Sequence, residues 1–103
     1  MVAMTTFTIE YAYDDRAAER DRHRPAHRAY LASLADEHRM LAYGRYDDDG
    51  APGALLVCEA ESLNEVESLI AADPFVRAGL VPEHRIRVWP AVFGSGLAGR
   101  LGE

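Results

Sequence analysis

The longest helix-like segment of the chain opens with the stretch RPAHRAYL, residues 24–31. Proline holds φ near the helical value and lacks the N–H that a first-turn residue leaves unpaired, so Pro25 is predicted to be the first helical residue. Leu31 and Leu34 follow His27 at the i+4 and i+7 positions of one helical stripe. We therefore expect a helix from Pro25 to about residue 37, with His27 facing the core and not the solvent.

Four segments around this helix have the patterns of β-strands. Thr5 to Tyr13 alternates between its two faces, which is the period of a strand. Met40 to Tyr43 predicts a short second strand. Residues 47–53, DDDGAPG, have the composition of a hairpin loop, and the run from Ala54 to Ala60 that follows is apolar on both faces, as central strands are. His84 to Val92 is predicted to be the last strand.

A second helix is predicted between the last two strands. Ser62 and Glu65 have the spacing of a capping box, in which each side chain satisfies a backbone N–H of the first turn, and the helix is expected to end near residue 72. Asp73 and Pro74 repeat a cap-plus-proline signature and predict a further helical turn through Ala78. The order of strand, helix, strand, strand, helix, strand predicts an α+β fold. It is of the ferredoxin-like split βαβ type, with a four-stranded antiparallel sheet and both helices on one face.

Length and patterning also predict the domain organisation. The 103 residues are expected to form one domain over residues 1–93, followed by a flexible Gly-rich C-terminal tail over residues 94–103. Two helices cover only one face of the sheet, and Trp89 is expected on the other. The uncovered face therefore predicts a homodimer that packs sheet to sheet.

The charge of the chain excludes several classes of function. A net charge of −6 argues against nucleic-acid binding. The eleven basic residues are all arginine, which excludes a Schiff-base lysine and a Walker-type phosphate loop. No apolar run approaches the roughly 20 residues that cross a bilayer, so no membrane partner is expected. Without a visible secretory signal, and with a single cysteine, the expected location is cytoplasmic.

The arginines at residues 16–28 alternate with acidic side chains, so most of this run is expected to be a solvated, self-paired surface. His23 and His27 have an i, i+4 spacing that can hold a metal, but no third ligand accompanies them, and we expect no metal. Cys58 lies in mid-strand and is expected to be a buried apolar residue and not a nucleophile.

His27 and Asp73 both lie near the starts of helical segments on the same side of the predicted fold. A carboxylate that accepts the Nδ1 proton of an imidazole leaves Nε2 available as a general acid or base. The ordinary alternatives are a core histidine bonded to the backbone and a simple N-cap ahead of Pro74. His84, at the start of the last strand, is expected either in the same cavity or on the surface.

Several pieces of the chain together resemble one family. They are RPAH at residues 24–27, Gly44, the strand over residues 53–60, ESL at residues 61–63, ADPF at residues 72–75, the step at residues 78–79, and Glu83-His84. From about Phe7 to Phe93 this pattern is similar to the YciI-like, or YCII-related, family. The resemblance implies a dimeric α+β barrel and an active site built on a histidine and an aspartate, which fall here at His27 and Asp73.

A related dehydrochlorinase, which acts on a chlorinated hydroxyquinol, extends what the resemblance implies. The chain is then a cofactor-independent enzyme of the lyase or isomerase type, which performs proton abstraction or elimination on a small aromatic or enolisable acid. His27 is the acid/base, Asp73 its orienting partner, and Arg24 the group that holds an anionic or enolate oxygen. The alternative is a noncatalytic small-molecule-binding or accessory dimeric protein. A third interpretation treats the exposed sheet face as an assembly surface for another protein.

Two positions depart from the family pattern. Arg45 follows Gly44 where many relatives have proline, and His38 stands where relatives often end the first helix with glycine. Arg45 can change what the pocket admits, so Arg45 and His84 join Arg24 as predicted substrate-binding residues.

Overall fold

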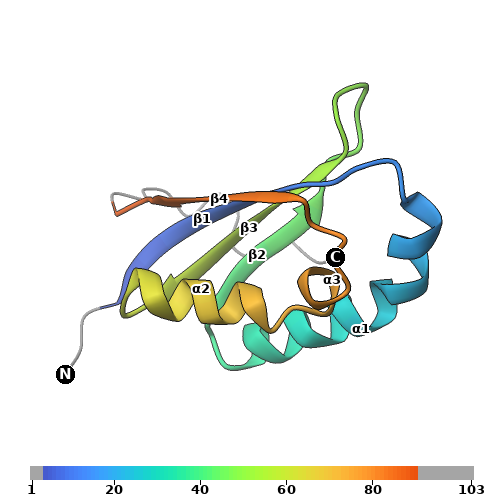
Figure 1. The fold of residues 1–103 in the computed structure, drawn as a ribbon. Helices are drawn as coiled ribbons and strands as arrows, with labels where there is room; N and C mark the ends of the chain where they lie inside the picture. Colours follow the sequence, from blue (N-terminus) through green and yellow to red (C-terminus); the bar gives the residue numbers. More distant parts are fainter. Residues whose placement is uncertain (1–3, 91–103) are drawn as a thin grey trace.

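A four-stranded antiparallel sheet with helices on one of its faces forms the body of the protein (Figure 1). The computed structural model describes residues 4–90. The elements in chain order are β1 (Thr5–Ala12), α1 (Ala17–Asp36), β2 (Met40–Arg45), β3 (Gly53–Ala60), α2 (Leu63–Ala71), α3 (Pro74–Arg77) and β4 (Glu83–Val88). The strands are ordered β2-β3-β1-β4, and each neighbouring pair is antiparallel. The predicted ferredoxin-like α+β fold is confirmed, and the predicted tail over residues 94–103 lies outside the described residues.

The core lies between the sheet and the helices because one face of each strand is apolar. Phe7, Ile9 and Tyr11 alternate along β1 and are at most 4% exposed. Ile9 lies opposite Leu56 of β3, and Phe7 lies opposite Cys58, which is fully buried as predicted. Burying a large apolar side chain contributes roughly 1.5–3 kcal/mol. A slip of one residue in this register would turn every one of these side chains to the wrong face.

The caps predicted for the second helix and for the turn after it are confirmed, except that the Glu65 carboxylate binds the N–H of the residue before the N-cap and not one of the first turn. The Ser62 hydroxyl accepts the Glu65 N–H at 3.2 Å, and the Glu65 carboxylate accepts the N–H of Glu61 at 3.0 Å. Asp73 caps α3 by accepting the N–H of Phe75 at 3.0 Å. The cap fixes where α3 begins, and it also fixes where the Asp73 carboxylate lies.

The prediction that the first helix begins at Pro25 is wrong. The helix begins at Ala17, and Pro25 lies inside it. An internal proline removes one i→i−4 hydrogen bond and bends the axis, and Figure 1 shows the first turns of α1 at an angle to the rest. Contacts from outside the helix hold these first turns. Arg20 is 6% exposed, donates to the Asp14 carbonyl at 2.7 Å, and lies over the Tyr13 ring. Arg20 is therefore an exception to the predicted solvated surface.

Several strand ends differ from the prediction, three of them by one residue and two by more. β2 runs to Arg45, beyond the expected end at Tyr43, and β4 ends at Val88, short of the expected Val92, which lies outside the described residues. β4 pairs only with β1, and its last paired residue lies opposite Phe7, near the start of that strand. The extension of β2 affects the position of Arg45, its last residue. Arg45 lies opposite the buried Ala54, so its side chain projects from the helix-covered face of the sheet.

His38 ends the first helix in an unusual conformation. Its φ is 60°, in the left-handed region, two residues beyond the last residue of α1. A side chain with a Cβ atom is disfavoured there by roughly 1 kcal/mol relative to glycine. This cost gives a physical reason for the glycine of the family pattern at this position.

The second face of the sheet is not covered by helices (Figure 1). Leu55 is 40% exposed, and the alternation of β3 places it on this face, opposite Glu10 of β1. Trp89, just beyond the end of β4, is 44% exposed. The sheet-to-sheet homodimer stays a prediction. Within residues 4–90, no helix has both the length and the apolar character needed to cross a membrane.

Candidate active site

His27 and Asp73 are in contact. His27 comes from the middle of α1 and Asp73 caps α3, and the imidazole Nδ1 lies 2.7 Å from carboxylate Oδ1. Asp73 is 0% exposed and His27 is 8% exposed. A carboxylate so placed accepts the Nδ1 proton, which leaves the lone pair on Nε2. The oxygen that caps the helix therefore also holds the imidazole.

Three donors surround the Asp73 carboxylate. Oδ1 accepts the Phe75 N–H as well as the imidazole proton, and Oδ2 accepts the hydroxyl proton of Tyr11 at 2.8 Å. Burial, reinforced by the negative charge of Asp73, raises the pKa of Tyr11 far above its usual range. The phenol therefore keeps its proton and remains a donor to the carboxylate.

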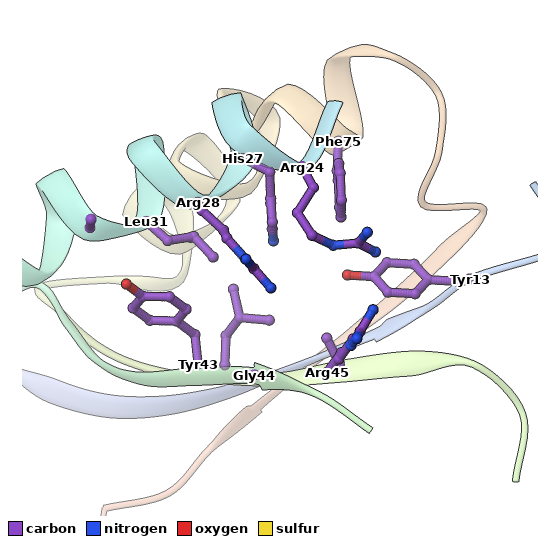
Figure 2. A pocket seen from close by; sticks show the side chains of 12 residues that line it. Tyr13, Arg24, His27, Arg28, Leu31, Tyr43, Gly44, Arg45 and Phe75 are labelled. Carbon is purple, nitrogen blue, oxygen red and sulfur yellow. The ribbon is translucent and has the colours of Figure 1, made fainter. Parts of the chain in front are cut away.

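Phe75 fixes the plane of the imidazole. Its ring stacks on that of His27, with centroids 3.9 Å apart and an interplanar angle of 3°. One ring face is covered and Nδ1 is bound, so the imidazole has a single orientation. In Figure 2 its outer nitrogen points away from α1 and into the cavity. Nε2 is thus available to exchange a proton with a molecule in the cavity.

A cavity of about 310 Å³ lies below His27, between α1 and the sheet (Figure 2). Small-molecule sites have volumes of roughly 300–1,000 Å³, so this one suits a small ligand. Its wall combines apolar side chains with three arginines and two tyrosines. The lining residues are Tyr13, Arg24, His27, Arg28, Leu31, Ala32, Tyr43, Gly44, Arg45, Ala54, Leu56 and Phe75. None of these described residues is acidic, so the cavity favours a molecule with negative charge.

Tyr13 contributes a neutral donor at one end of the cavity. Burial and the charge of Asp73 raise the pKa of Tyr13 to about 12. The hydroxyl therefore stays protonated at neutral pH, and Figure 2 shows it pointing inward.

The structure brings four of the five predicted site residues together. His27, Arg24 and Arg45 line the cavity, and Asp73 lies behind the imidazole. His84 does not line it. It lies on β4, at the edge of the sheet opposite β2, where its Nε2 is 3.5 Å from a carboxylate oxygen of Glu67. The expectation that His84 shares the cavity with His27 is therefore not met, because the strand order separates them.

The sequence prediction omitted Tyr11 and Arg28. Arg28 follows Arg24 by four positions and lies on the helical stripe of His27, and that spacing is the signal that identifies it. Tyr11 lies on the apolar face of its strand, where a buried hydroxyl needs a partner. Within residues 4–90, no three His, Cys, Asp or Glu side chains gather closely enough to hold a metal.

The fold and the cavity together define a small ferredoxin-like α+β domain with a buried histidine–aspartate pair. The model of the YCII-related domain matches residues 4–90. This chain belongs to the YCII-related family, as the sequence predicts. The protein YciI of Escherichia coli O6:H1 and that of Shigella flexneri are each 36% identical to it over 95 residues, covering 82% of this chain and 97% of theirs.

Two solved structures extend the comparison. One is 5-chloro-2-hydroxyhydroquinone dehydrochlorinase from Burkholderia phenoliruptrix, in complex with 2,5-dihydroxybenzoquinone. It is similar with a TM-score of 0.72 and 29% identity, covering 84% of this chain and 95% of that one. SnoaB, a cofactor-independent oxygenase from Streptomyces nogalater, has a TM-score of 0.53 and 11% identity, covering 90% of this chain and 97% of that one. At 11% identity, the similarity to SnoaB shows a shared fold and nothing about function.

Proposed function

We propose that this protein is a cofactor-independent enzyme of the lyase or isomerase type, which moves a proton of a small aromatic or enolisable acid through His27. The observation that carries the proposal is the 2.7 Å contact between His27 Nδ1 and the buried Asp73, beside a cavity lined by arginines. The likeness to a dehydrochlorinase supports the same class of reaction.

In the proposed reaction, Nε2 of His27 accepts a proton from a carbon next to a carbonyl group of the substrate. The Asp73 carboxylate accepts the hydrogen bond from Nδ1–H, which keeps that proton on the imidazole, and it stabilises the imidazolium that forms. The electron pair of the broken C–H bond moves onto the carbonyl oxygen as an enolate. In an elimination, the enolate electrons then form a C=C bond to the neighbouring carbon that carries the leaving group. Chloride, or another leaving group, departs from that carbon with the electron pair of the bond that breaks. In an isomerisation, His27 returns the proton to a different atom.

Arg24 is the group proposed to stabilise the enolate oxygen. Its guanidinium pairs with Asp21 and lies 5.9 Å from the centroid of the Phe75 ring, which also stacks on the imidazole. These contacts hold a positive charge close to His27 before any substrate enters. A charge that needs no reorganisation is what stabilises a developing anion most strongly.

Hydrogen exchange in D₂O tests the proposal. A panel of enolisable and halogenated hydroxyaromatic acids is incubated with the protein, and deuterium incorporation is followed by NMR together with chloride release. General acid–base catalysis contributes roughly 10²–10⁴-fold to a rate, so we expect a loss of this size in His27→Gln. His84→Gln is the matched control, because this histidine also faces a carboxylate but lies outside the cavity.

Asp73→Asn isolates the role of the carboxylate, since asparagine retains an oxygen that can cap α3. A slower rate in a variant that circular dichroism shows to be folded at the assay temperature supports the dyad. Full turnover in both His27→Gln and Asp73→Asn would contradict the assignment of the two residues as a catalytic dyad. Recovery of a tightly bound ligand without deuterium, from the wild-type protein, would instead favour the noncatalytic binder.

A further inference from the structure

The three arginines of the cavity lie at two different ends of it. Arg24, Arg45 and Tyr13 line both this cavity and a neighbouring hollow of about 240 Å³, so they mark the end at which the two meet. Arg28 lines the first cavity and not the second. In Figure 2 it lies on the side of Tyr43, away from Tyr13. The cavity thus has one cationic end at Arg24 and Arg45 and another at Arg28.

His27 and an apolar floor occupy the space between these ends. Arg24, His27 and Arg28 share one stripe of α1, and Figure 2 shows the two arginines leaving the helix on either side of His27. The floor below contains Ala54 and Leu56 of β3, which are 3% and 2% exposed. A flat, apolar molecular body fits between the imidazole and this floor.

The charges of Arg28 and Arg45 are not compensated within the fold. At the N-cap and in the first turns of α1, four arginines each pair with an acidic side chain: Arg16, Arg20, Arg22 and Arg24. Among the described residues, no acidic group lies within salt-bridge distance of Arg28 or Arg45, although the chain carries a net charge of −6. Both side chains are exposed and keep their charge under ordinary conditions, so a bound anion can pair with either of them.

We propose that the ligand of this cavity is a planar dianion, with one acidic group held by Arg24 and Arg45 and the second held by Arg28. This inference rests on the proposed function for the position of the reacting atom below His27, and it adds a second acidic group to the substrate class. A guanidinium binds a carboxylate through two parallel hydrogen bonds, so each end selects an acid and fixes its orientation.

Calorimetric titration with simple aromatic acids tests the proposal. Benzoate has one carboxylate, phthalate has two on adjacent carbons, and isophthalate and terephthalate have two that point to different sides of the ring. A charged hydrogen-bonded contact at the second end corresponds to about a tenfold gain in affinity. We expect the better of isophthalate and terephthalate to exceed benzoate by this factor, and phthalate to stay close to benzoate.

Arg28→Gln is expected to lower the affinity of the better dicarboxylate to that of benzoate, and to leave benzoate within about twofold of its wild-type value. Arg22→Gln removes the same charge from an exposed position of α1 that pairs with Glu19 and does not line the cavity. In this control, the ratio between the two acids should not change.

Equal affinity for benzoate and the dicarboxylates in the wild type would overturn the proposal. So would equal weakening of both acids in Arg28→Gln, or no measurable binding of any of them. The binding ratio does not depend on turnover. His27→Gln should retain the preference for the dicarboxylate even though it loses exchange activity. If the wild type prefers the dicarboxylate but exchanges no hydrogen of any substrate, the proposed reaction is wrong and the proposed dianion site stands.

Discussion

Replacing Tyr11 with phenylalanine removes one hydroxyl from the Asp73 carboxylate and leaves the ring in the core. Tyr11 is 1% exposed, and its hydroxyl lies 2.8 Å from Oδ2. Among the described residues, Oδ1 retains two donors after the change and Oδ2 retains none. A hydrogen bond to a charged group contributes roughly 1.5–3 kcal/mol. We therefore expect Tyr11→Phe to lower the free energy of unfolding by about 2 kcal/mol.

Urea unfolding followed by circular dichroism measures this change, with the slope on urea concentration checked for constancy. Tyr30→Phe is the matched control. Its hydroxyl donates to the neutral carbonyl of Leu69 at 2.7 Å, so its loss should cost about 1 kcal/mol. The reasoning is refuted if Tyr11→Phe costs no more than Tyr30→Phe, because the charge of Asp73 would then add nothing to the bond.

Three further predictions concern other parts of the chain. His38→Gly should raise the free energy of unfolding by about 1 kcal/mol, because glycine adopts the left-handed conformation without strain; urea midpoints measure this. Burial raises the pKa of the Cys58 thiol from 9.0 to about 11, so between these pH values the unfolded chain loses a proton that the native state keeps. Stability should therefore fall by roughly 2–3 kcal/mol as pH rises through this window, and less in Cys58→Ala. Leu55→Asp should convert the predicted homodimer to a monomer in light scattering, because the interface would desolvate the new charge. Leu63→Asp, at a leucine that is 52% exposed on α2, should not.

Each of these three has an outcome that contradicts it. For the helix end, it is an unchanged urea midpoint in His38→Gly. For the thiol, it is an equal dependence of stability on pH in Cys58→Ala and the wild type. For the sheet face, it is either a monomeric wild type or a Leu55→Asp variant that remains a dimer.

The fold was largely predictable because its strongest signals act over a few residues. The capping box at Ser62 and the cap at Asp73 are satisfied by backbone N–H groups of their own first turns. The start of α1 was not predictable in this way. Pro25 has a local signature typical of a helix start, but the contact of Arg20 with Tyr13 and Asp14 belongs to the packed molecule, and it extends the helix past the proline.

Parts of the site could be predicted from local patterns and from the family resemblance. His27 could be found because it occupies an apolar stripe. The bond between Tyr11 and Asp73 joins residues 62 positions apart, and it depends on how β1 lies against α3. His84 was misplaced for the same reason. The strand order puts β4 and β2 at opposite edges of the sheet, which separates His84 from the cavity.

The double use of Asp73 Oδ1 has a consequence for the descent of the family. Because this oxygen both caps α3 and holds the imidazole, selection for the fold alone favours its retention. A lineage that lost the function of the cavity would still be expected to keep the aspartate with the scaffold, whereas the cap places no such demand on His27. Arg28 and Arg45 have no comparable structural duty, so they are able to diverge whenever the ligand does. Differences at these two positions between branches of the family are therefore the ones to follow when its ligands are traced.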